Sequence, residues 1–242
     1  MHQGILLDFT LQHWCVWQQD FDSALSYSDG AVLPSNNGQA DVSFLPPMQS
    51  RRLSPLAKAA NAVAWYCLQQ CGVMPAVFYS THGESHYYFA MLQDMAAGEV
   101  VSPSRFSLCV HNAIAGLSSF YNHSTLPYIC LAGGTDGVFA AFVEAAGLLL
   151  ETERVLLVCY EQALPEAYQP YLASSKNTWA WAVVLSKAGG TGRQLRLKRS
   201  VEVTATVTED AAQQFMQTLI GHGNQAVCRQ QHAVWQWNLD HA

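Results

Sequence analysis

The sequence predicts an α/β fold in which a mixed, mostly buried sheet is sandwiched between helices. Short apolar runs without polar alternation recur at 75–80, 154–160 and 179–186, a pattern typical of strands that are covered on both faces. Segments with helical signals lie between these runs, and Gly- and Pro-rich turns punctuate them. A length of 242 residues is compatible with one large domain. We therefore expect a single domain over residues 1–242.

In the first part of the chain, residues 5–17 predict one strand with an extended piece, and 27–49 predict a loop rich in Gly, Asn and Pro. A helix should begin after Ser54, which suits the N-cap, with Pro55 in its first turn, and should end at Gly72. The order then predicted is a strand, a turn and a second helix, at 75–80, 82–84 and 85–97.

The stretch 101–150 predicts a helix, a short strand, a Gly-rich turn and another helix, the last three at 126–132, 133–137 and 138–150. Segment 161–172 holds two Pro and predicts a short helix or loop. Further along, one or two strands, a helix closed by Gly221 and a strand-like tail are expected at 195–207, 211–220 and 226–239.

The composition is unusually poor in charge. Half of the residues are hydrophobic and only 12% are charged, against about 25% in an ordinary soluble domain. Part of the surface is therefore expected to meet a partner, although an uncharged surface rich in Gln, Ser and Thr is the alternative. The net charge of −6 and the lack of any basic block besides the loose run 193–199 argue against nucleic acid as a partner.

No apolar run is long enough to span a bilayer, because Glu144 interrupts segment 138–150 and Glu151 closes it. The first residues lack the basic flank and long apolar core of a signal peptide. We expect a cytoplasmic protein without stable membrane insertion. The 7 Cys are odd in number and mostly lie in apolar segments, which favours buried free thiols. Cys67 and Cys71 have no second pair at metal-ligand spacing, so no metal is expected.

Few residues suggest chemistry. Thr135 and Asp136 open the helix after the Gly-rich turn, where both side chains suit an N-cap. Thr135 could act as a nucleophile only with a base beside it, and His111 is the candidate for that base. His82 and Glu84 could form an acid/base pair or simply cap the next helix. The Cys130 thiol should be packed and neutral inside its strand.

Four segments carry a family resemblance: RRLSPLAKAANAVAWYCLQQCG, VFYSTHGESHYYFAMLQDM, SPSRFSLCVHNAIAGLSSF and YICLAGGTDGVFAAF. Together they resemble the N-terminal half of β-ketoacyl synthases, which have the thiolase-like fold, and cover roughly residues 50–190. The combination of THGE, SPxxFSxxVHNAxAG and AGGTD is similar to short β-ketoacyl-synthase-like proteins of aryl polyene gene clusters, described as chain length factors. The resemblance implies five mixed strands between helices.

The same resemblance places the catalytic Cys of the family at Thr135, so the scaffold is present and the nucleophile is absent. Nothing after Thr191 resembles the second half of condensing enzymes, which supplies two His and a Lys. His222 has only a superficial likeness to one of them. The resemblance thus implies a non-catalytic subunit that pairs with a full-length, Cys-bearing synthase. It implies no cofactor in this chain; the complex would use phosphopantetheine-bound acyl chains on an acyl carrier protein.

The resemblance also assigns two surfaces. The strand before the nucleophile lies at the two-fold axis of thiolase-fold dimers, which implies an interface strand containing Leu126, Tyr128, Ile129, Cys130 and Leu131. Helical spacing places one stripe on a single face, and the resemblance directs it at the partner's acyl channel: Ile114, Leu117, Ser118 and Tyr121. Alternatively, this stripe packs into the chain's own core. Two other functions stay open: a stand-alone acyl transferase or hydrolase using Thr135 and His111, and a pure scaffold for the synthase.

Overall fold

The computed structural model describes residues 4–133, 137–172, 175–200, 210–230 and 233–240. Its framework is one sheet of ten strands with the order β5-β4-β6-β7-β1-β8-β10-β9, to which β3 adds beside β1 and β2 beside β3. Parallel pairs join β4 to β5 and to β6, whereas β6, β7, β1 and β8 pair antiparallel. The predicted α/β fold with a mixed sheet is confirmed, although the sheet holds more than the five strands that the resemblance implied.

The strands are β1 (Leu6–Gln18), β2 (Leu25–Tyr27), β3 (Gly30–Leu33), β4 (Ala76–Tyr79), β5 (Tyr128–Leu131), β6 (Arg154–Glu161), β7 (Trp179–Lys187), β8 (Arg193–Ser200), β9 (Gln225–Gln230) and β10 (Ala233–Leu239). The helices are α1 (Pro47–Ser50), α2 (Pro55–Cys71), α3 (Ser85–Ala96), α4 (Pro103–Cys109), α5 (Ala113–Tyr121), α6 (Phe139–Leu148) and α7 (Ala211–Leu219).

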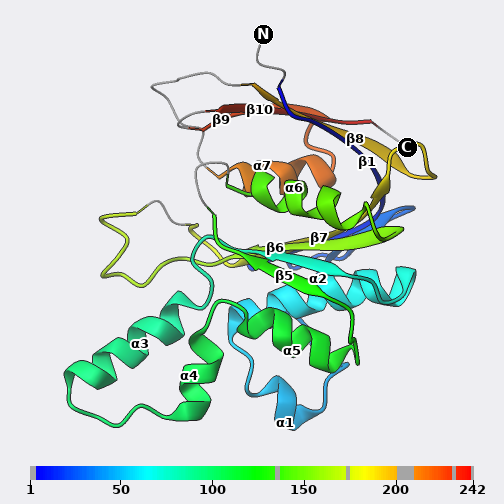
Figure 1. Cartoon of the computed structure of the whole chain (residues 1–242). Coiled ribbons are helices and arrows are strands. Elements are labelled where there is room, and N and C mark those ends of the chain that lie inside the picture. Colours follow the sequence, from blue (N-terminus) through cyan, green and yellow to red (C-terminus); the bar gives the residue numbers. More distant parts are fainter. Residues whose placement is uncertain (1–3, 134–136, 173–174, 201–209, 231–232, 241–242) are drawn as a thin grey trace.

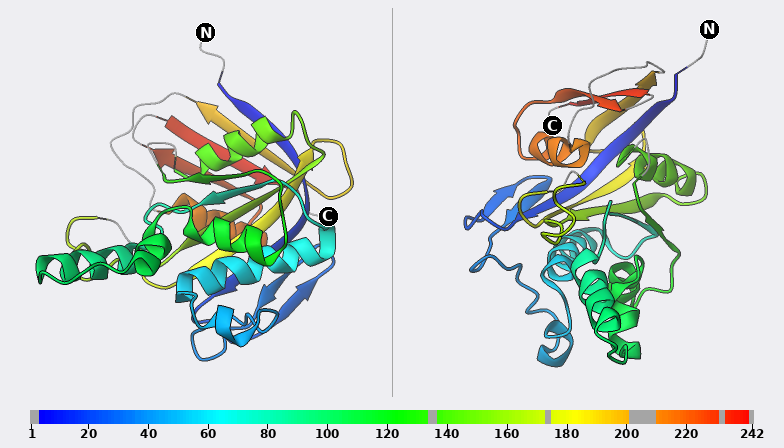
Figure 2. Two further views of the ribbon diagram at one scale, coloured as in Figure 1. Left: turned by 60° about the horizontal axis from the view of Figure 1, so that its bottom comes forward. Right: turned by 90° about the vertical axis from the view of Figure 1, so that its left-hand side faces the viewer.

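The sheet curls so that its two ends enclose a layer of helices. Figure 1 shows α6 and α7 between the β1-β8-β10-β9 part above and the β5-β4-β6-β7 part below, with α2 and α5 covering the opposite face of the lower part. Two hydrophobic clusters match these layers, one around α6 and α7 and one between α2, α5 and the sheet. Helices α3 and α4 project at one end (Figure 2).

Strand β7 shows how one strand serves both clusters. Successive side chains of a strand point to opposite faces, so Trp179 and Trp181 join the cluster of α6 and α7, while Ala180 and Ala182 face α2. The indole Nε1 of Trp181 donates to the carbonyl of Ala212, 3.0 Å away, which satisfies its only polar atom. This burial on both faces is why β7 reads as an unbroken apolar run in the sequence.

Helix α2 begins and ends where the sequence predicts. The Ser54 hydroxyl accepts a hydrogen bond from the Ala57 backbone N–H at 2.8 Å, Pro55 is the first helical residue, and Gly72 closes the helix at φ +80°. Small side chains let the helix lie close to the alanine face of β7; the buried alanines of α2 are Ala57, Ala59, Ala60, Ala62 and Ala64.

Two expectations for the elements are wrong. The 27–49 stretch is not only loop, because β3 pairs in parallel with the second half of β1. The helix expected before β5 is two helices, since Val110 adopts extended backbone (ψ 147°) and ends α4 before α5 begins. The tail is made of strands as expected, and these form a hairpin of β9 and β10. Segment 161–172, expected as a short helix or loop, forms turns after Glu161. Among the described residues, the structure has no helix with the length and hydropathy of a membrane span.

Candidate functional site

The candidate site lies where the parallel strands β4, β5 and β6 end. Tyr79, the last residue of β4, stands opposite Leu131 of β5 and Cys159 of β6. Loops that leave the carboxyl ends of such strands are the usual place for binding sites in α/β sheets. Thr135 and Asp136 follow β5 in the sequence but lie outside the described residues, so their roles stay predictions.

Tyr79 fixes the chain as it leaves β5. A Cβ atom at Gly133 would collide with the Tyr79 hydroxyl, so only glycine allows this close approach. The same hydroxyl shares a hydrogen bond of 3.3 Å with Oγ1 of Thr81. Burial raises the pKa of Tyr79 far above its ordinary value, which keeps the phenol neutral.

Glu161 closes β6 and is buried beside the end of β4. One of its carboxylate oxygens accepts a hydrogen bond from the Thr81 backbone N–H. Desolvation raises the pKa of Glu161 to about 7. The hydrogen bonds from Thr81 and Ser80 lower it and so offset part of this rise. The sequence analysis did not select Glu161, although a Glu directly after the apolar run RVLLVCY was a usable signal.

Glu84 is a second buried acid at this edge of the sheet. The Ser54 hydroxyl donates to its Oε1 at 2.6 Å, while the same hydroxyl caps α2, so Glu84 ties the turn after β4 to that helix. The turn is also held by the Gly83 N–H, which donates to Oγ of Ser80 at 2.7 Å. Desolvation raises the pKa of Glu84 to about 7, and the Ser54 hydrogen bond partly offsets it. Glu84 does not cap α3 with its side chain.

The structure brings His111 to the predicted His82–Glu84 turn. His111 lies in the break between α4 and α5, and its Nδ1 would be 2.9 Å from a Cβ atom at Gly83, which has φ +53°. His82, Glu84 and His111 line one cavity of about 230 Å³. The two weak candidate groups of the sequence analysis therefore belong to a single site.

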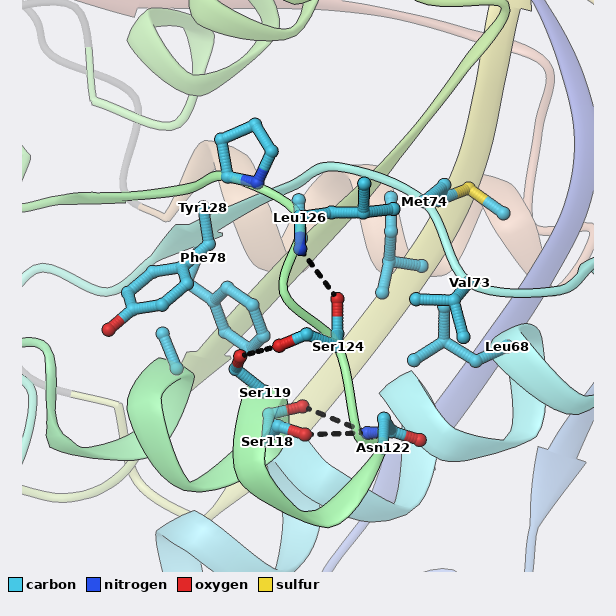
Figure 3. A pocket seen from close by; sticks show the side chains of 14 residues that line it. Leu68, Val73, Met74, Phe78, Ser118, Ser119, Asn122, Ser124, Leu126 and Tyr128 are labelled. Atoms are coloured by element: carbon cyan, nitrogen blue, oxygen red, sulfur yellow. Dashed lines mark hydrogen bonds between the residues drawn. The ribbon is translucent and has the colours of Figure 1, made fainter.

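The α5 stripe divides between buried and half-exposed positions. Ile114 is 1% exposed and packs in the same cluster as α2, Ser118 is 3% exposed, and Leu117 and Tyr121 are half-buried at the edge of that cluster. Figure 3 shows Ser118 and Asn122 at a narrow cavity of about 20 Å³, where the amide of Asn122 donates a hydrogen bond of 2.8 Å to the Ser118 carbonyl. The burial of Ile114 and Ser118 fits the alternative that these two residues pack in the chain's own core, and the acyl-channel role of the stripe stays a prediction.

The predicted interface strand is an edge strand. Its central part, β5, pairs only with β4 among the described residues. The carbonyls of Pro127 and Leu131 accept from β4, and this alternation leaves the backbone groups of Tyr128 and Cys130 facing the open edge. The side chains of Leu126 and Tyr128 are 40% and 38% exposed. Large apolar side chains are also exposed elsewhere on the surface, among them Val73, Phe106, Phe120 and Met95.

The remaining candidates stand apart from this site. All seven Cys lie within the described residues and are free thiols, as predicted. Burial raises the pKa of Cys130 to about 11, so its thiol is neutral. No group of three or more His, Cys, Asp or Glu in the described part of the chain could hold a metal ion. His222 is exposed in the turn that ends α7.

Comparison with known families gives one extended match. The family model for the β-ketoacyl synthase N-terminal domain matches residues 14–238, which is most of the chain. That range exceeds the 50–190 region in which the sequence motifs lie. No curated protein matches this chain.

Solved structures of low sequence identity have the same fold. A chain from the complex of the ketosynthase ApeO with its chain length factor ApeC from Xenorhabdus doucetiae is 22% identical, with 96% of this chain and 99% of that chain covered and a TM-score of 0.77. The ishigamide ketosynthase/chain length factor is 12% identical, with 81% and 68% covered and a TM-score of 0.57. A bacillaene ketosynthase from Bacillus amyloliquefaciens FZB42 is 12% identical, with 83% and 47% covered and a TM-score of 0.55.

Proposed function

Because this chain belongs to the β-ketoacyl synthase N-terminal domain family, we propose that it is the non-catalytic chain length factor of a β-ketoacyl synthase complex that makes aryl polyenes. Its partner is a full-length synthase that carries the catalytic Cys. The growing acyl chain arrives on the phosphopantetheine arm of an acyl carrier protein, and this chain binds no cofactor of its own. The complex works in the cytoplasm.

The observation that carries the proposal is the open edge of β5. The backbone groups of Tyr128 and Cys130 face away from β4 and have no strand beside them in the described part of the chain, and with the half-exposed Leu126 and Tyr128 side chains they form a surface on which a second strand can add. The low content of charge fits a chain that buries part of its surface against a partner. The similarity to a chain of comparable length from a ketosynthase–chain length factor complex supports the same assignment.

The chemistry of the site supports a non-catalytic role. Condensation needs a thiolate nucleophile, and the thiol nearest to Thr135 in the sequence, Cys130, has its pKa raised to about 11. Glu84 and Glu161 are buried acids that hold backbone and side-chain groups in place. They supply no nucleophile for acyl transfer.

Co-expression tests the proposal. We expect the chain alone to self-associate or to be poorly soluble, since its apolar edge is uncovered, and to form a stable complex when a Cys-bearing synthase from the same operon is present. Size-exclusion chromatography with light scattering measures both states. A monodisperse monomer with no measurable affinity for the synthase would contradict the proposal, and acyl-thioester turnover by the chain alone would favour the enzyme alternative.

The length of the product should respond to the half-exposed part of α5. Leu117→Ala should lengthen the polyene, because an acyl chain stops growing where it meets a close-packed wall. Mass spectrometry of carrier-bound products measures the effect. Ile114→Ala is the matched control: it removes a core side chain that is 1% exposed, so we expect a loss of about 2–5 kcal/mol in stability instead. Unchanged product lengths in Leu117→Ala would assign this face to scaffolding.

A further inference from the structure

Helices α3 and α4 form an arm, residues 85–109, that buries little of its own surface. Figure 1 shows both helices projecting beyond the sheet. Met91 is the only buried residue of α3, and α4 has no buried residue. The two helices are joined to each other by the ion pair of Asp94 with Arg105, and the Cys109 thiol lies 3.8 Å from the Met91 sulfur. An element with so little buried apolar surface has low local stability and can move as a unit.

The two connections of this arm to the rest of the molecule lie side by side. The chain enters the arm through Gly83, which has φ +53°, and leaves it through Val110, whose backbone is extended. A Cβ atom at Gly83 would be only 2.9 Å from Nδ1 of His111, so the entering and leaving segments pack against each other. Hinges are short stretches of this kind, at the ends of elements, where a few φ and ψ angles absorb a rotation.

A hydrogen bond fastens this hinge to α2. The Ser54 hydroxyl donates to Oε1 of Glu84 at 2.6 Å and accepts from the Ala57 N–H at 2.8 Å, so one hydroxyl serves both the cap of α2 and the start of the arm. Glu84 and Ser54 are each 5% exposed. The Glu84 carbonyl accepts from the Tyr88 N–H at 3.0 Å, which makes Glu84 part of the first turn of α3. Glu84 is therefore a point at which the arm meets the body of the fold.

Other contacts of the arm reach the segment after β6 instead of α2. A ring nitrogen of His86 hydrogen-bonds the Ala163 carbonyl at 2.8 Å, and the Phe89 ring packs edge-on against Tyr168 with centroids 5.2 Å apart. That segment lies at the surface, since Tyr171 is 81% exposed. The bond between Glu84 and Ser54 is thus the contact that ties the arm to a buried helix.

We propose that the arm is a pH-sensitive switch, in which the hydrogen bond from Ser54 to the protonated Glu84 latches it onto α2 and loss of the Glu84 proton releases it. Rotation about the hinge at 83–84 and 110–111 lets water reach the carboxylate, and a carboxylate without an ion partner is stable only when it is solvated. The proton goes to solvent, and the Ser54–Glu84 hydrogen bond is exchanged for hydrogen bonds to water. This switch goes beyond the proposed subunit role and does not depend on it.

The surroundings of Glu84 favour the protonated form while the arm is latched. Desolvation raises the pKa of Glu84 to about 7, and the hydrogen bond from Ser54 offsets part of this rise. No Lys or Arg in the described part of the chain forms an ion pair with Glu84. Helix α2 contributes only the Ser54 hydroxyl, and the titratable groups of the other elements near Glu84 or around the adjacent cavity are His82, Tyr87, Tyr88, Cys109, His111, Tyr160 and Tyr168.

The direction of the response follows from proton linkage. The pKa of Glu84 is about 7 in the latched arm and returns to its ordinary value of 4.5 when the side chain is solvated. Between these values the latched state binds more protons than the released state, so the released fraction rises with pH and levels off above about pH 7. From pH 6 to pH 8.5 the equilibrium should shift towards release by about tenfold.

Hydrogen–deuterium exchange on the full chain, alone or in the complex in which it purifies, tests the switch. After correction for the intrinsic pH dependence of exchange, the opening of α3 amides should increase about tenfold from pH 6 to pH 8.5, while α6 amides stay protected. Glu84→Gln keeps an oxygen for Ser54 and has no proton to lose, so its opening should not change with pH. Glu99→Gln removes an exposed acid between α3 and α4 and should keep the wild-type response. A flat wild-type response, or a response that persists in Glu84→Gln, would overturn the proposal.

Ser54→Gly tests the latch at any single pH. Glycine is tolerated at an N-cap, so α2 should stay folded while the bond to Glu84 is lost. The opening of α3 at pH 6 should then rise by about fivefold. Faster exchange in the first turn of α2 alone would show that Ser54 is only a cap, and the latch would be wrong. If Ser54→Gly does not fold, the pH profiles of the wild type and Glu84→Gln decide the question.

Discussion

Replacing Cys130 by proline should separate the chain from its synthase while the chain stays folded. The Cys130 N–H faces the open edge of β5, because the carbonyls of Pro127 and Leu131 bond towards β4 and alternate residues of a strand direct their backbone groups to opposite sides. Proline removes that N–H and places a ring where a partner strand would pair. Proline is tolerated on edge strands when the missing N–H points outward, so the ladder with β4 should survive.

The expected result is at least about a hundredfold loss of affinity, which corresponds to about 3 kcal/mol, together with loss of condensation by the mixture. Calorimetry with purified synthase measures the affinity, and circular dichroism checks the fold. Cys130→Ala keeps the N–H and should bind normally. Ile129→Pro, whose N–H faces β4, should instead destabilise the strand. If Cys130→Pro binds like the wild type, strand pairing across β5 is not how the complex forms.

Glu161→Gln should make the chain markedly more stable than the wild type at pH 8 but not at pH 4.5. Burial raises the pKa of Glu161 in the folded state to about 7, above the ordinary value of 4.5. Between these values the folded state binds more protons than the unfolded state, so the stability of the wild type falls as pH rises. The shift corresponds to a loss of about 3 kcal/mol at most, which accumulates as pH rises from about 4.5 to about 7 and is complete above that range. Glutamine retains an oxygen for the Thr81 N–H without this ionisation.

Urea denaturation at several pH values measures this difference. Glu84 also titrates near pH 7, but it is present in both proteins and cancels in the comparison. Glu166→Gln is the matched control, since Glu166 is exposed in the segment that follows and its removal should change little. A constant difference between wild type and Glu161→Gln from pH 4.5 to 8 would show that Glu161 is not held at a raised pKa.

Local sequence patterns predicted those elements whose ends carry capping residues, Pro or Gly. Ser54 and Pro55 predict the start of α2, and Gly72 predicts its end. The break at Val110 carries no Gly or Pro, so no residue there predicts that the helix divides. Strand β3 is four residues long and is stabilised by its pairing with β1, which no local pattern encodes.

The residues of the candidate site were predicted separately, because local sequence patterns do not show which residues tertiary packing brings together. His111 and the His82–Glu84 turn were each weak candidates, and only tertiary packing places the ring of His111 against Gly83. Glu161 looked like the ordinary polar end of a strand, whereas its burial beside Thr81 depends on β4 and β6 being neighbours. The interface strand was predicted from resemblance, and the structure adds that it lies at a free edge of the sheet.

Strand β1 sets the order in which this chain can fold. Among the described strands, its two long partners, β7 and β8, begin only at Trp179 and Arg193, and only the four-residue β3 pairs with it from nearby in the sequence (Figure 2). Closing contacts over such long sequence separations is slow, because loop entropy must be lost before the pairing stabilises anything. During synthesis the apolar β1 therefore stays without its two long partners until the residues of β7 and β8 have been made. A nascent chain in this state is exposed to aggregation and is a natural client for chaperones.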